Sequence, residues 1–330
     1  MTAALPPALV LAAGLGLRLR PLTCRRAKPA VPVANVPLIR RILSWLRRSG
    51  VRDVVVNLHY RPQTITGVVG DGRDLDLRIR YSWERRILGT AGGPRHALDL
   101  LGPTFLIVNG DTLTDVDLAG LVGAHADREA KVTLATIPSP DPHRYGGVDD
   151  DEQHRVRGFS RPGQTDRAAH FIGVQVVEAS VFASLADGVA AATIGGLYDD
   201  LLTRIPGSVC TYPTTARFLD IGTPDDYVRT SASITAEEQG RPAGLQTTAI
   251  HPDATLVRTI VWDRVTIARH ATLTDCIVMD DVRVQAGARF EREILLPADA
   301  AADIDGRRVG DVVAVPLGPD ARKSNPTTPL

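Results

Sequence analysis

The sequence has few cysteines and no long hydrophobic run, and both absences narrow the class of protein. Its three cysteines, Cys24, Cys210 and Cys276, lie far apart in a chain of 330 residues. An odd number of widely spaced thiols favours a reducing compartment and matches no metal-binding spacing. The apolar run at residues 8–13 is too short for a signal peptide or a membrane span, and basic residues follow it rather than precede it. We therefore expect a cytoplasmic protein that is not bound to a membrane.

An excess of charge of one sign is also missing. Lys+Arg and Asp+Glu both count 38, so the formal net charge is +0. A chain without a basic excess lacks the electrostatic footprint of a nucleic-acid-binding protein. The hydrophobic fraction of 44% and the length predict an ordinary globular protein of about two domains.

The first half of the chain alternates apolar runs with helical patterns. Apolar or alternating runs predict strands, and apolar residues at helical spacing predict helices. The predicted strands are 8–13, 51–57, 77–82, 105–111 and 131–138, and the predicted helices are 37–49, 91–101 and 118–127. This order predicts an α/β fold with a Rossmann-like mixed, mostly parallel sheet and helices on both faces. Ligands of such sheets bind at the carboxyl ends of the strands.

The stretch "LVLAAGLGLRLRPLTCRRAKP" at residues 9–29 follows the first strand with two glycines and then five basic residues. A dinucleotide fold is the first hypothesis for Gly14-x-Gly16, but Leu19 occupies the third glycine position and the second strand ends in "NLHY" without an acid. The chain also has no G-x-x-x-x-G-K-[ST] motif. A glycine turn followed by fixed positive charge remains, which suits a triphosphate.

Four of these five basic residues are given a specific interpretation. Arg18 and Lys28 are predicted to bind phosphate, because guanidinium pairs phosphate oxygens and ammonium acts as a point charge. Arg25 and Arg26 are predicted to be solvated residues of the loop.

Five motifs in order resemble those of the sugar-1-phosphate nucleotidyltransferases, the pyrophosphorylases that make NDP-sugars. They are "LAAGLGLRLRPLTCRRAKPAVPVANVPLI", "LGTAGG", "FLIVNGDTLTDVDL", "YGGV" and "FLDIGTPDDY", and they cover roughly residues 5–235. The likeness is strongest to the mannose-1-phosphate guanylyltransferase-like branch. The resemblance implies an enzyme in which a sugar 1-phosphate oxygen attacks the α-phosphorus of a nucleoside triphosphate and pyrophosphate leaves. Catalysis of this kind is mainly positioning and charge neutralisation.

The resemblance also implies roles for individual residues. Arg18 would contact the leaving pyrophosphate, and Lys28 would neutralise charge between the two substrates. Asp111 and Asp220 would be the Mg²⁺ ligands, with a helix cap and a turn residue as their alternatives. The implied nucleotide-binding residues are Leu11, Ala12, Ala13, Gly14, Gly16, Glu84, Gly89, Thr90, Asn109 and Gly110, and the implied sugar-phosphate-binding residues are Gly147, Arg161 and Glu178.

Three departures from the family pattern lie on the sugar side. Ala27 replaces the proline before the signature lysine, "Ser160-Arg161-Pro162" replaces Glu-Lys-Pro, and Phe171 replaces an asparagine. They leave the sugar open: mannose 1-phosphate or a sugar-like cyclitol 1-phosphate.

Glu84 carries the prediction of the base. Members of the family that use uracil or thymine have glutamine at this position, and a carboxylate only accepts hydrogen bonds. Guanine offers two adjacent donors, so Glu84 predicts GTP over UTP, dTTP and ATP. The alternative is a solvated Glu84 beside Arg85 and Arg86.

The C-terminal third repeats itself. Residues 254–270 and 271–287 are identical at seven of seventeen positions, and "ARFEREIL" opens a third copy at Ala288. Short β-branched runs at a fixed period predict a solenoid, and this period resembles a short left-handed β-helix. The predicted domains are a catalytic domain at 1–236, a linker at 237–249, the β-helix at 250–315 and a mobile tail at 316–330. So few coils leave exposed ends, which predicts a homo-oligomer.

Two functions from other classes compete with this reading. A noncatalytic regulatory paralogue would lose active-site charges, but Arg18, Lys28, Asp111 and Asp220 are all present. A nicotinamide-dependent dehydrogenase would need the dinucleotide motif that fails above.

Overall fold

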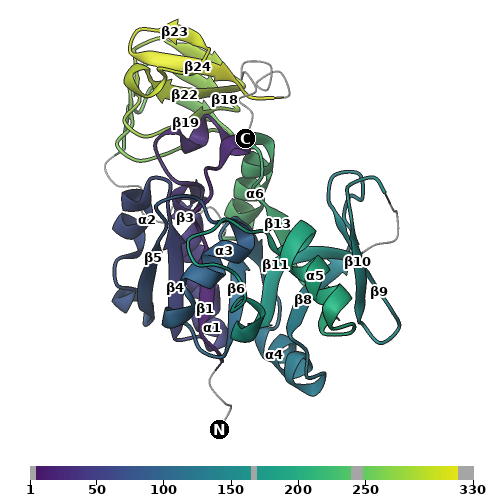
Figure 1. The fold of residues 1–330 in the computed structure, drawn as a ribbon. Helices are drawn as coiled ribbons and strands as arrows, with labels where there is room; N and C mark the ends of the chain where they lie inside the picture. The colour runs from purple at the N-terminus through teal and green to yellow at the C-terminus, as the bar shows by residue number, and fades with distance from the viewer. Residues whose placement is uncertain (1–4, 165–168, 239–247, 319–330) are drawn as a thin grey trace. The chain divides into compact units, whose positions relative to one another are not determined.

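The computed structural model describes residues 5–164, 169–238 and 248–318 (Figure 1). The chain divides into two units: Met1–Leu15 with Ile39–Leu219, and Gly16–Leu38 with Asp220–Leu330. The glycine-rich stretch near the amino terminus is therefore split, with its first part in one unit and its basic part in the other. Of the predicted linker, residues 239–247 lie outside the described residues, and so do residues 319–330 of the predicted tail.

The first unit is built on a nine-stranded mixed sheet. The strands of this unit are β1 (Ala8–Leu11), β4 (Asp53–Leu58), β5 (Arg78–Trp83), β6 (Thr104–Asn109), β7 (Thr112–Thr114), β8 (Val132–Pro138), β9 (Gly147–Asp150), β10 (Val156–Ser160), β11 (Ala169–Glu178), β12 (Val209–Pro213) and β13 (Phe218–Asp220), which ends one residue into the second unit. Strands β5, β4, β1 and β6 are parallel neighbours in that order, and β11 joins β6 in the antiparallel direction. Small β7 and β13 form a separate two-stranded sheet.

Helices connect these strands. They are α1 (Leu38–Ser49), α2 (Pro62–Val69), α3 (Gly89–His96), α4 (Leu118–Asp127) and α5 (Tyr198–Arg204), and 3₁₀ turns lie at η4 (Arg73–Leu75), η5 (Leu98–Leu100) and η6 (Ala179–Val181). Residues 54–58 of β4 are all buried, although successive side chains of a strand point to opposite faces. Both faces of the sheet are therefore covered, as the α/β pattern of the sequence predicts. Among the described residues, no helix combines the length and apolar character needed to cross a membrane.

The predicted elements of the first half are confirmed, with shifted ends. Helix α4 has the predicted bounds, whereas β1 ends at Leu11 rather than at residue 13. The strand ends early because the N–H of Ala12 turns away to donate to the side chain of Asn57. Helix α3 begins two residues before the predicted start, and a short 3₁₀ turn replaces its predicted last turn.

The second unit combines the basic part of the amino-terminal stretch with the carboxyl third of the chain. It contains η1 (Leu17–Leu19), η2 (Leu22–Cys24), η3 (Lys28–Ala30), β2 (Pro32–Val33), β3 (Val36–Pro37) and α6 (Pro224–Glu237), followed by β14 (Ala249–Ile250), β15 (Thr255–Val257), β16 (Ile260–Val261), β17 (Thr266–Ile267), β18 (Thr272–Thr274), β19 (Ile277–Val278), β20 (Arg283–Val284), β21 (Arg289–Glu291), β22 (Glu293–Pro297), η8 (Ala298–Ala300), β23 (Arg307–Val309) and β24 (Val312–Pro316). A capping box between Thr223 and Asp226 begins α6.

The strands from β14 to β22, which we call the C-terminal stack (residues 249–297), lie in three sheets and pair with one another in parallel. Antiparallel β24 and β23 extend the third of these sheets. Thr255 pairs with Thr272 and Thr272 with Arg289, so each strand pairs with the strand 17 residues further along. The turns repeat at the same spacing, because Arg258, Asp275 and Arg292 all have positive φ. Apolar side chains of successive strands, such as Leu273 and Phe290, fill the interior. This arrangement confirms the repeat read from the sequence. The predicted homo-oligomer stays a prediction.

Candidate active site

The carboxyl ends of β1, β4, β5 and β6 bring several predicted nucleotide-binding residues to one edge of the sheet. Leu11 pairs with Asn109, and the N–H of Gly110 donates to the carbonyl of Leu11 at 2.9 Å. Ala12 and Ala13 are buried beyond the end of β1, and Gly14 is exposed with open space where a side chain would lie. The backbone at this edge is therefore accessible at a glycine, which is the feature a phosphate-binding turn requires.

A hydrogen-bonded chain that the sequence did not predict holds this edge together. The N–H of Ala12 donates to Asn57 Oδ1 at 2.6 Å, and Asn57 Nδ2 donates to Glu84 Oε1 at 2.7 Å. The other carboxylate oxygen, Glu84 Oε2, accepts from the N–H of Leu88 at 2.9 Å. We call these contacts the Glu84–Asn57 relay. The relay links the turn after β1 to the segment before α3.

Glu84 is buried, with a relative exposure of 6%, so the alternative of a solvated residue is wrong. The sequence predicts a forked pair between its carboxylate and guanine, but both oxygens already have partners inside the protein. These contacts fix the positions of Asn57 and Leu88. Each carboxylate oxygen has two acceptor positions, so the predicted pair with guanine stays a prediction.

The start of α3 is also tied down. Gly89 has φ +74, and a Cβ there would lie 2.6 Å from the carbonyl oxygen of Ala191. Thr90 Oγ1 accepts hydrogen bonds from the N–H of Thr193 at 2.9 Å and from its hydroxyl at 3.0 Å. Gly89 and Thr90 themselves are exposed, so this backbone is accessible beside the relay.

Asn109 and Asp111 follow the buried strand β6. A Cβ at Gly173, which has φ +79, would lie 2.7 Å from Asn109 Nδ2, so glycine makes room for this amide. Asp111 lies immediately before β7, and Asp220 is the last residue of β13, the strand with which β7 forms its sheet. The cap of α4 is Asp117, whose carboxylate accepts from the N–H of Ala119, so Asp111 is not that cap.

The donor chemistry of Asp111 and Asp220 fits Mg²⁺. Both offer only carboxylate oxygens, which hard cations prefer, and Mg²⁺ at phosphoryl-transfer sites uses one or two carboxylates together with substrate phosphates. The described residues contain no cluster of three or more His, Cys, Asp or Glu side chains that would hold a metal without such phosphates.

The predicted sugar-phosphate residues do not lie together. Gly147 begins β9 and pairs with Ser160, while Arg161 is exposed in the turn that follows β10. Glu178 pairs with Thr104, at the end of β6 opposite to Asn109. Five residues of extended strand span roughly 17 Å.

Glu178 has structural partners at that far end. Its Oε1 accepts from the hydroxyl of Thr104 at 2.7 Å and lies 3.5 Å from His125 Nε2. Burial, opposed by the charge of Glu178, lowers the pKa of His125. We therefore leave Glu178 out of the proposed site.

The structure contains a group of aromatic rings beside β9 that the sequence does not predict. The ring of His170 lies 4.6 Å from that of Tyr145 and 4.7 Å from that of Phe218, centre to centre. His170 is the residue directly before Phe171, one of the noted departures, and "YGGV" contains Tyr145. No periodicity connects three rings from separate segments, so only their position after folding could identify them.

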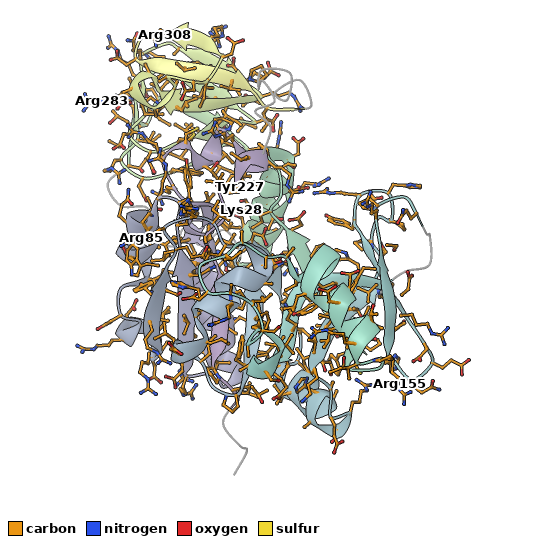
Figure 2. All side chains as sticks on the ribbon, in the orientation of Figure 1. Lys28, Arg85, Arg155, Tyr227, Arg283 and Arg308 are labelled. Carbon is orange, nitrogen blue, oxygen red and sulfur yellow. The ribbon has the colours of Figure 1, made fainter. Side chains whose placement is uncertain are left out.

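The second unit contains Gly16, Arg18 and Lys28. Gly16 has φ +64, and its carbonyl accepts from the N–H of Leu19 at 3.1 Å and from the hydroxyl of Thr23 at 3.0 Å. Arg18 is exposed on the turn η1. Lys28, which Figure 2 labels, is buried at the start of η3. A turn that requires glycine thus precedes Arg18 and Lys28, the two basic residues predicted to bind phosphate.

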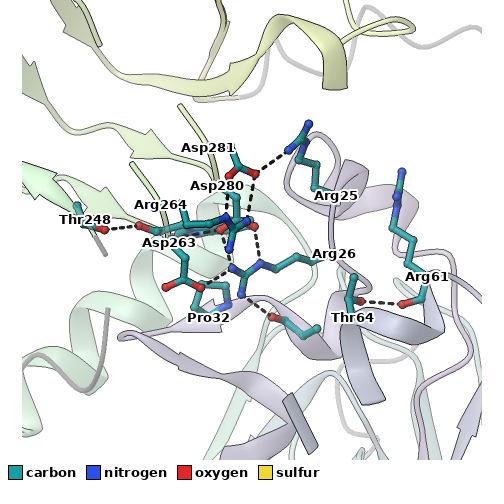
Figure 3. Close-up of polar contacts among 12 residues, drawn as sticks. Arg25, Arg26, Pro32, Arg61, Thr64, Thr248, Asp263, Arg264, Asp280 and Asp281 are labelled. Carbon is teal, nitrogen blue, oxygen red and sulfur yellow. Dashed lines mark hydrogen bonds and ion pairs between the residues drawn. The ribbon is translucent and has the colours of Figure 1, made fainter. Parts of the chain in front are cut away.

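The prediction that Arg25 and Arg26 are solvated loop residues is wrong for Arg26, which is buried, while Arg25 is partly exposed and held in ion pairs. Arg25 pairs with Asp281 and Asp299 at 2.7 Å each (Figure 3 shows the first pair). Arg26 is buried and pairs with Asp263 and Asp280 at 2.6 Å each (Figure 3). Burial pushes the pKa of Arg26 down, but the two aspartates outweigh it and the pKa is raised.

Comparison with known proteins shows which proteins this chain resembles. Residues 7–237 match the family model described as nucleotidyl transferase. Mannose-1-phosphate guanylyltransferase of Mycobacterium tuberculosis is 33% identical over 299 residues, which cover 86% of this chain and 83% of that protein. UTP–glucose-1-phosphate uridylyltransferase of Synechocystis is 27% identical over 250 residues, covering 70% of this chain and 64% of that protein.

The fold has solved counterparts. The crystal structure of HddC from Yersinia pseudotuberculosis complexed with GMP-PN superposes with a TM-score of 0.61 at 23% identity, over 70% of this chain and 100% of that one. With the family model matching well over half of its length, this chain belongs to the sugar-1-phosphate nucleotidyltransferases.

Proposed function

We propose that this nucleotidyltransferase uses GTP and a mannose 1-phosphate-like sugar phosphate, or a related cyclitol 1-phosphate, and releases pyrophosphate. The observation that carries the proposal is the 33% identity to a mannose-1-phosphate guanylyltransferase over 86% of the chain. A uridylyltransferase at 27% identity supports UTP as the second candidate.

The proposed roles of the residues follow the chemistry of phosphoryl transfer. The sugar phosphate oxygen forms a bond to the α-phosphorus, and the bond from that phosphorus to the pyrophosphate oxygen breaks. Arg18 pairs the leaving pyrophosphate through its planar fork, and Lys28 neutralises charge as the two polyanions approach. The backbone at Gly14, which is exposed with open space around it, leaves room for the nucleotide. Asp111 and Asp220 are the proposed Mg²⁺ ligands, and the metal, when bound, neutralises phosphate charge.

We assign Glu84 a different part in the choice of base from the one the sequence suggests. Its carboxylate holds Asn57 and Leu88, and through them it fixes the turn after β1 and the start of α3. In this proposal it shapes the nucleotide-binding edge without touching the base.

A matrix of nucleoside triphosphates against sugar 1-phosphates, scored by released pyrophosphate in the presence of Mg²⁺, tests the proposal. The four triphosphates are GTP, UTP, dTTP and ATP, and the acceptors are mannose, glucose and a cyclitol 1-phosphate. We expect the highest kcat/KM with GTP. A preference for UTP or dTTP would contradict the guanylyltransferase assignment, and a preference for glucose 1-phosphate would contradict the acceptor.

A further inference from the structure

We propose that Arg26 is a positioning residue for nucleotidyl transfer, which fastens the segment carrying Lys28 to the C-terminal stack. The proposal rests on the proposed function, because it gives Lys28 a role in catalysis. It assigns to the repeats at the end of the chain a part in the chemistry of a loop near the beginning.

The contacts of Arg26 reach two successive turns of the stack. Its Nε and Nη2 donate to the two oxygens of Asp280 at 2.6 Å each, and Nη2 also donates to Asp263 at 2.6 Å (Figure 3). Asp263 and Asp280 lie 17 residues apart, the period of the repeat, and the N–H of Asp263 donates to Asp280 Oδ1 at 3.2 Å. The guanidinium also lies 5.5 Å from the ring centre of Trp262. Because the stack repeats, it presents two carboxylates side by side to one guanidinium.

A second attachment lies on the other side of Lys28. Tyr227 of α6 donates its hydroxyl to the carbonyl of Pro32 at 2.7 Å. The same hydroxyl accepts from Trp262 Nε1 at 2.8 Å, and both rings are fully buried. Arg26 and Pro32 therefore both meet the surroundings of Trp262, one before Lys28 and one after it.

Backbone hydrogen bonds close the short segment between these attachments into a turn. The N–H of Ala30 donates to the carbonyl of Ala27 at 2.8 Å, and that of Val31 donates to the carbonyl of Lys28 at 3.1 Å, which closes the turn η3. Lys28 follows Arg26 by two residues, so a shift of Arg26 moves the backbone that carries the ammonium group. Misplacement of a catalytic group by about 1 Å costs on the order of a hundredfold in rate.

The chemistry of the pair favours positioning over stability. Arg26 and Asp280 have relative exposures of 9% and 3%, and the desolvation of two buried charges offsets much of their attraction. What a bidentate, planar pair supplies is a fixed geometry. Arg25, the residue before Arg26, pairs with Asp281 and Asp299 and so helps to hold the same segment. Its side chain is more exposed than that of Arg26.

The test compares Arg26→Gln, Arg26→Lys and Asp280→Asn in the full-length enzyme, with the substrate pair that the matrix identifies. We expect Arg26→Gln and Asp280→Asn to lower kcat about tenfold to a hundredfold with KM little changed. Arg26→Lys keeps the charge but loses the fork, so its kcat should lie between wild type and Arg26→Gln. The matched control is Arg258→Gln, which breaks an exposed pair with Asp275 in the same stack, at 2.6 Å, and should leave kcat unchanged.

Stability and function are separated by two further measurements. Thermal unfolding shows whether each variant is folded at the assay temperature, and Trp262 fluorescence, in a background with Trp45→Phe and Trp83→Phe, reports the surroundings of Arg26. If Arg26→Gln does not fold, Arg26→Lys, which keeps the buried charge and loses the bidentate pair with Asp280, replaces it. A folded Arg26→Gln or Arg26→Lys with wild-type kcat would overturn the proposal, whether or not the Trp262 emission shifts. Wild-type enzyme that releases no pyrophosphate in any arm of the matrix would instead contradict the proposed function.

Discussion

The two parts of the amino-terminal stretch are held by different kinds of contact. Residues up to Leu15 are held in the first unit by parallel strand pairing and by the neutral donors of the Glu84–Asn57 relay. Residues from Gly16 onward are held in the second unit by charged pairs from Arg25 and Arg26 to aspartates of the carboxyl third. The first part is held by strand pairing and by hydrogen bonds from neutral donors. The second part is held by ion pairs, together with the hydrogen bond from Tyr227 to Pro32.

This difference matters because the two kinds of contact respond differently to perturbation. Each donor in the relay has one acceptor, and a lost acceptor leaves a buried N–H unsatisfied. Ion pairs respond to salt and to pH, the more so where they are exposed. Selective variants and solution conditions can therefore weaken one part of the stretch while leaving the other intact.

The largest effect is expected from Asp111 and Asp220, the two carboxylates that we propose as metal ligands. Asp111→Asn and Asp220→Asn should each lower turnover by orders of magnitude while thermal unfolding stays close to wild type, because a carboxylate ligand is replaced by a neutral amide. The measurement is pyrophosphate release as a function of Mg²⁺ concentration. The control is Asp117→Asn, since asparagine also caps a helix such as α4. Undiminished wild-type activity in EDTA would refute the metal assignment.

A smaller effect is expected from Glu84→Gln, which attacks the relay. Glu84 accepts from two donors, Asn57 Nδ2 and the N–H of Leu88, whereas glutamine brings one acceptor and one donor. Turning the amide of Asn57 does not help, because Asn57 Oδ1 is needed by the N–H of Ala12. One donor is left facing another, which should cost about 1–3 kcal/mol in the free energy of unfolding.

The relay also predicts how this variant behaves as an enzyme. We expect Glu84→Gln to lower kcat with all four triphosphates, measured by pyrophosphate release, because the edge of the sheet is disturbed for every base. The control is Asp53→Asn, at the start of β4, the strand that carries Asn57, where the carboxylate pairs with exposed Arg78. A loss confined to GTP, with unfolding unchanged, would restore the direct pair between Glu84 and guanine.

The same comparison explains what the sequence could predict. Local patterns located the strands, because burial on both faces requires continuous apolar runs such as residues 105–108, and the edge of the sheet follows from strand order. The repeat was visible because its period is constant. The partners of Arg26 were not visible, since they lie 237 and 254 residues further along the chain. Glu84 was selected, but its partners depend on the packing of β4 beside β5 and could not be read from spacing.

The smallest effect is expected from Arg25→Gln, which weakens the ionic attachment at its exposed edge. The Arg25 and Asp281 side chains have relative exposures of 27% and 37%, and Asp299 has 72%, so water and salt screen both pairs. Exposed pairs contribute about 0.2–1 kcal/mol, and we expect a loss in that range in the free energy of unfolding at low salt. At about 1 M NaCl the Debye length is about 3 Å, so the difference between variant and wild type should vanish there.

The pH dependence of Arg25→Gln follows from Asp281, whose pKa is lowered chiefly by its hydrogen bond to Arg264 and also by Arg25. Because the pKa of Asp281 is lowered in the folded state, its ionised form stabilises the fold at pH values above the ordinary pKa of 3.8. This stabilisation is lost as the pH falls below 3.8 and through the lowered pKa. Arg25→Gln should therefore differ from wild type at neutral pH and converge with it in acid, as measured by denaturant unfolding at several pH values. A loss that persists in 1 M salt would mean that Arg25 acts by packing, and the contrast between an ionic and a neutral attachment would then hold for Arg26 alone.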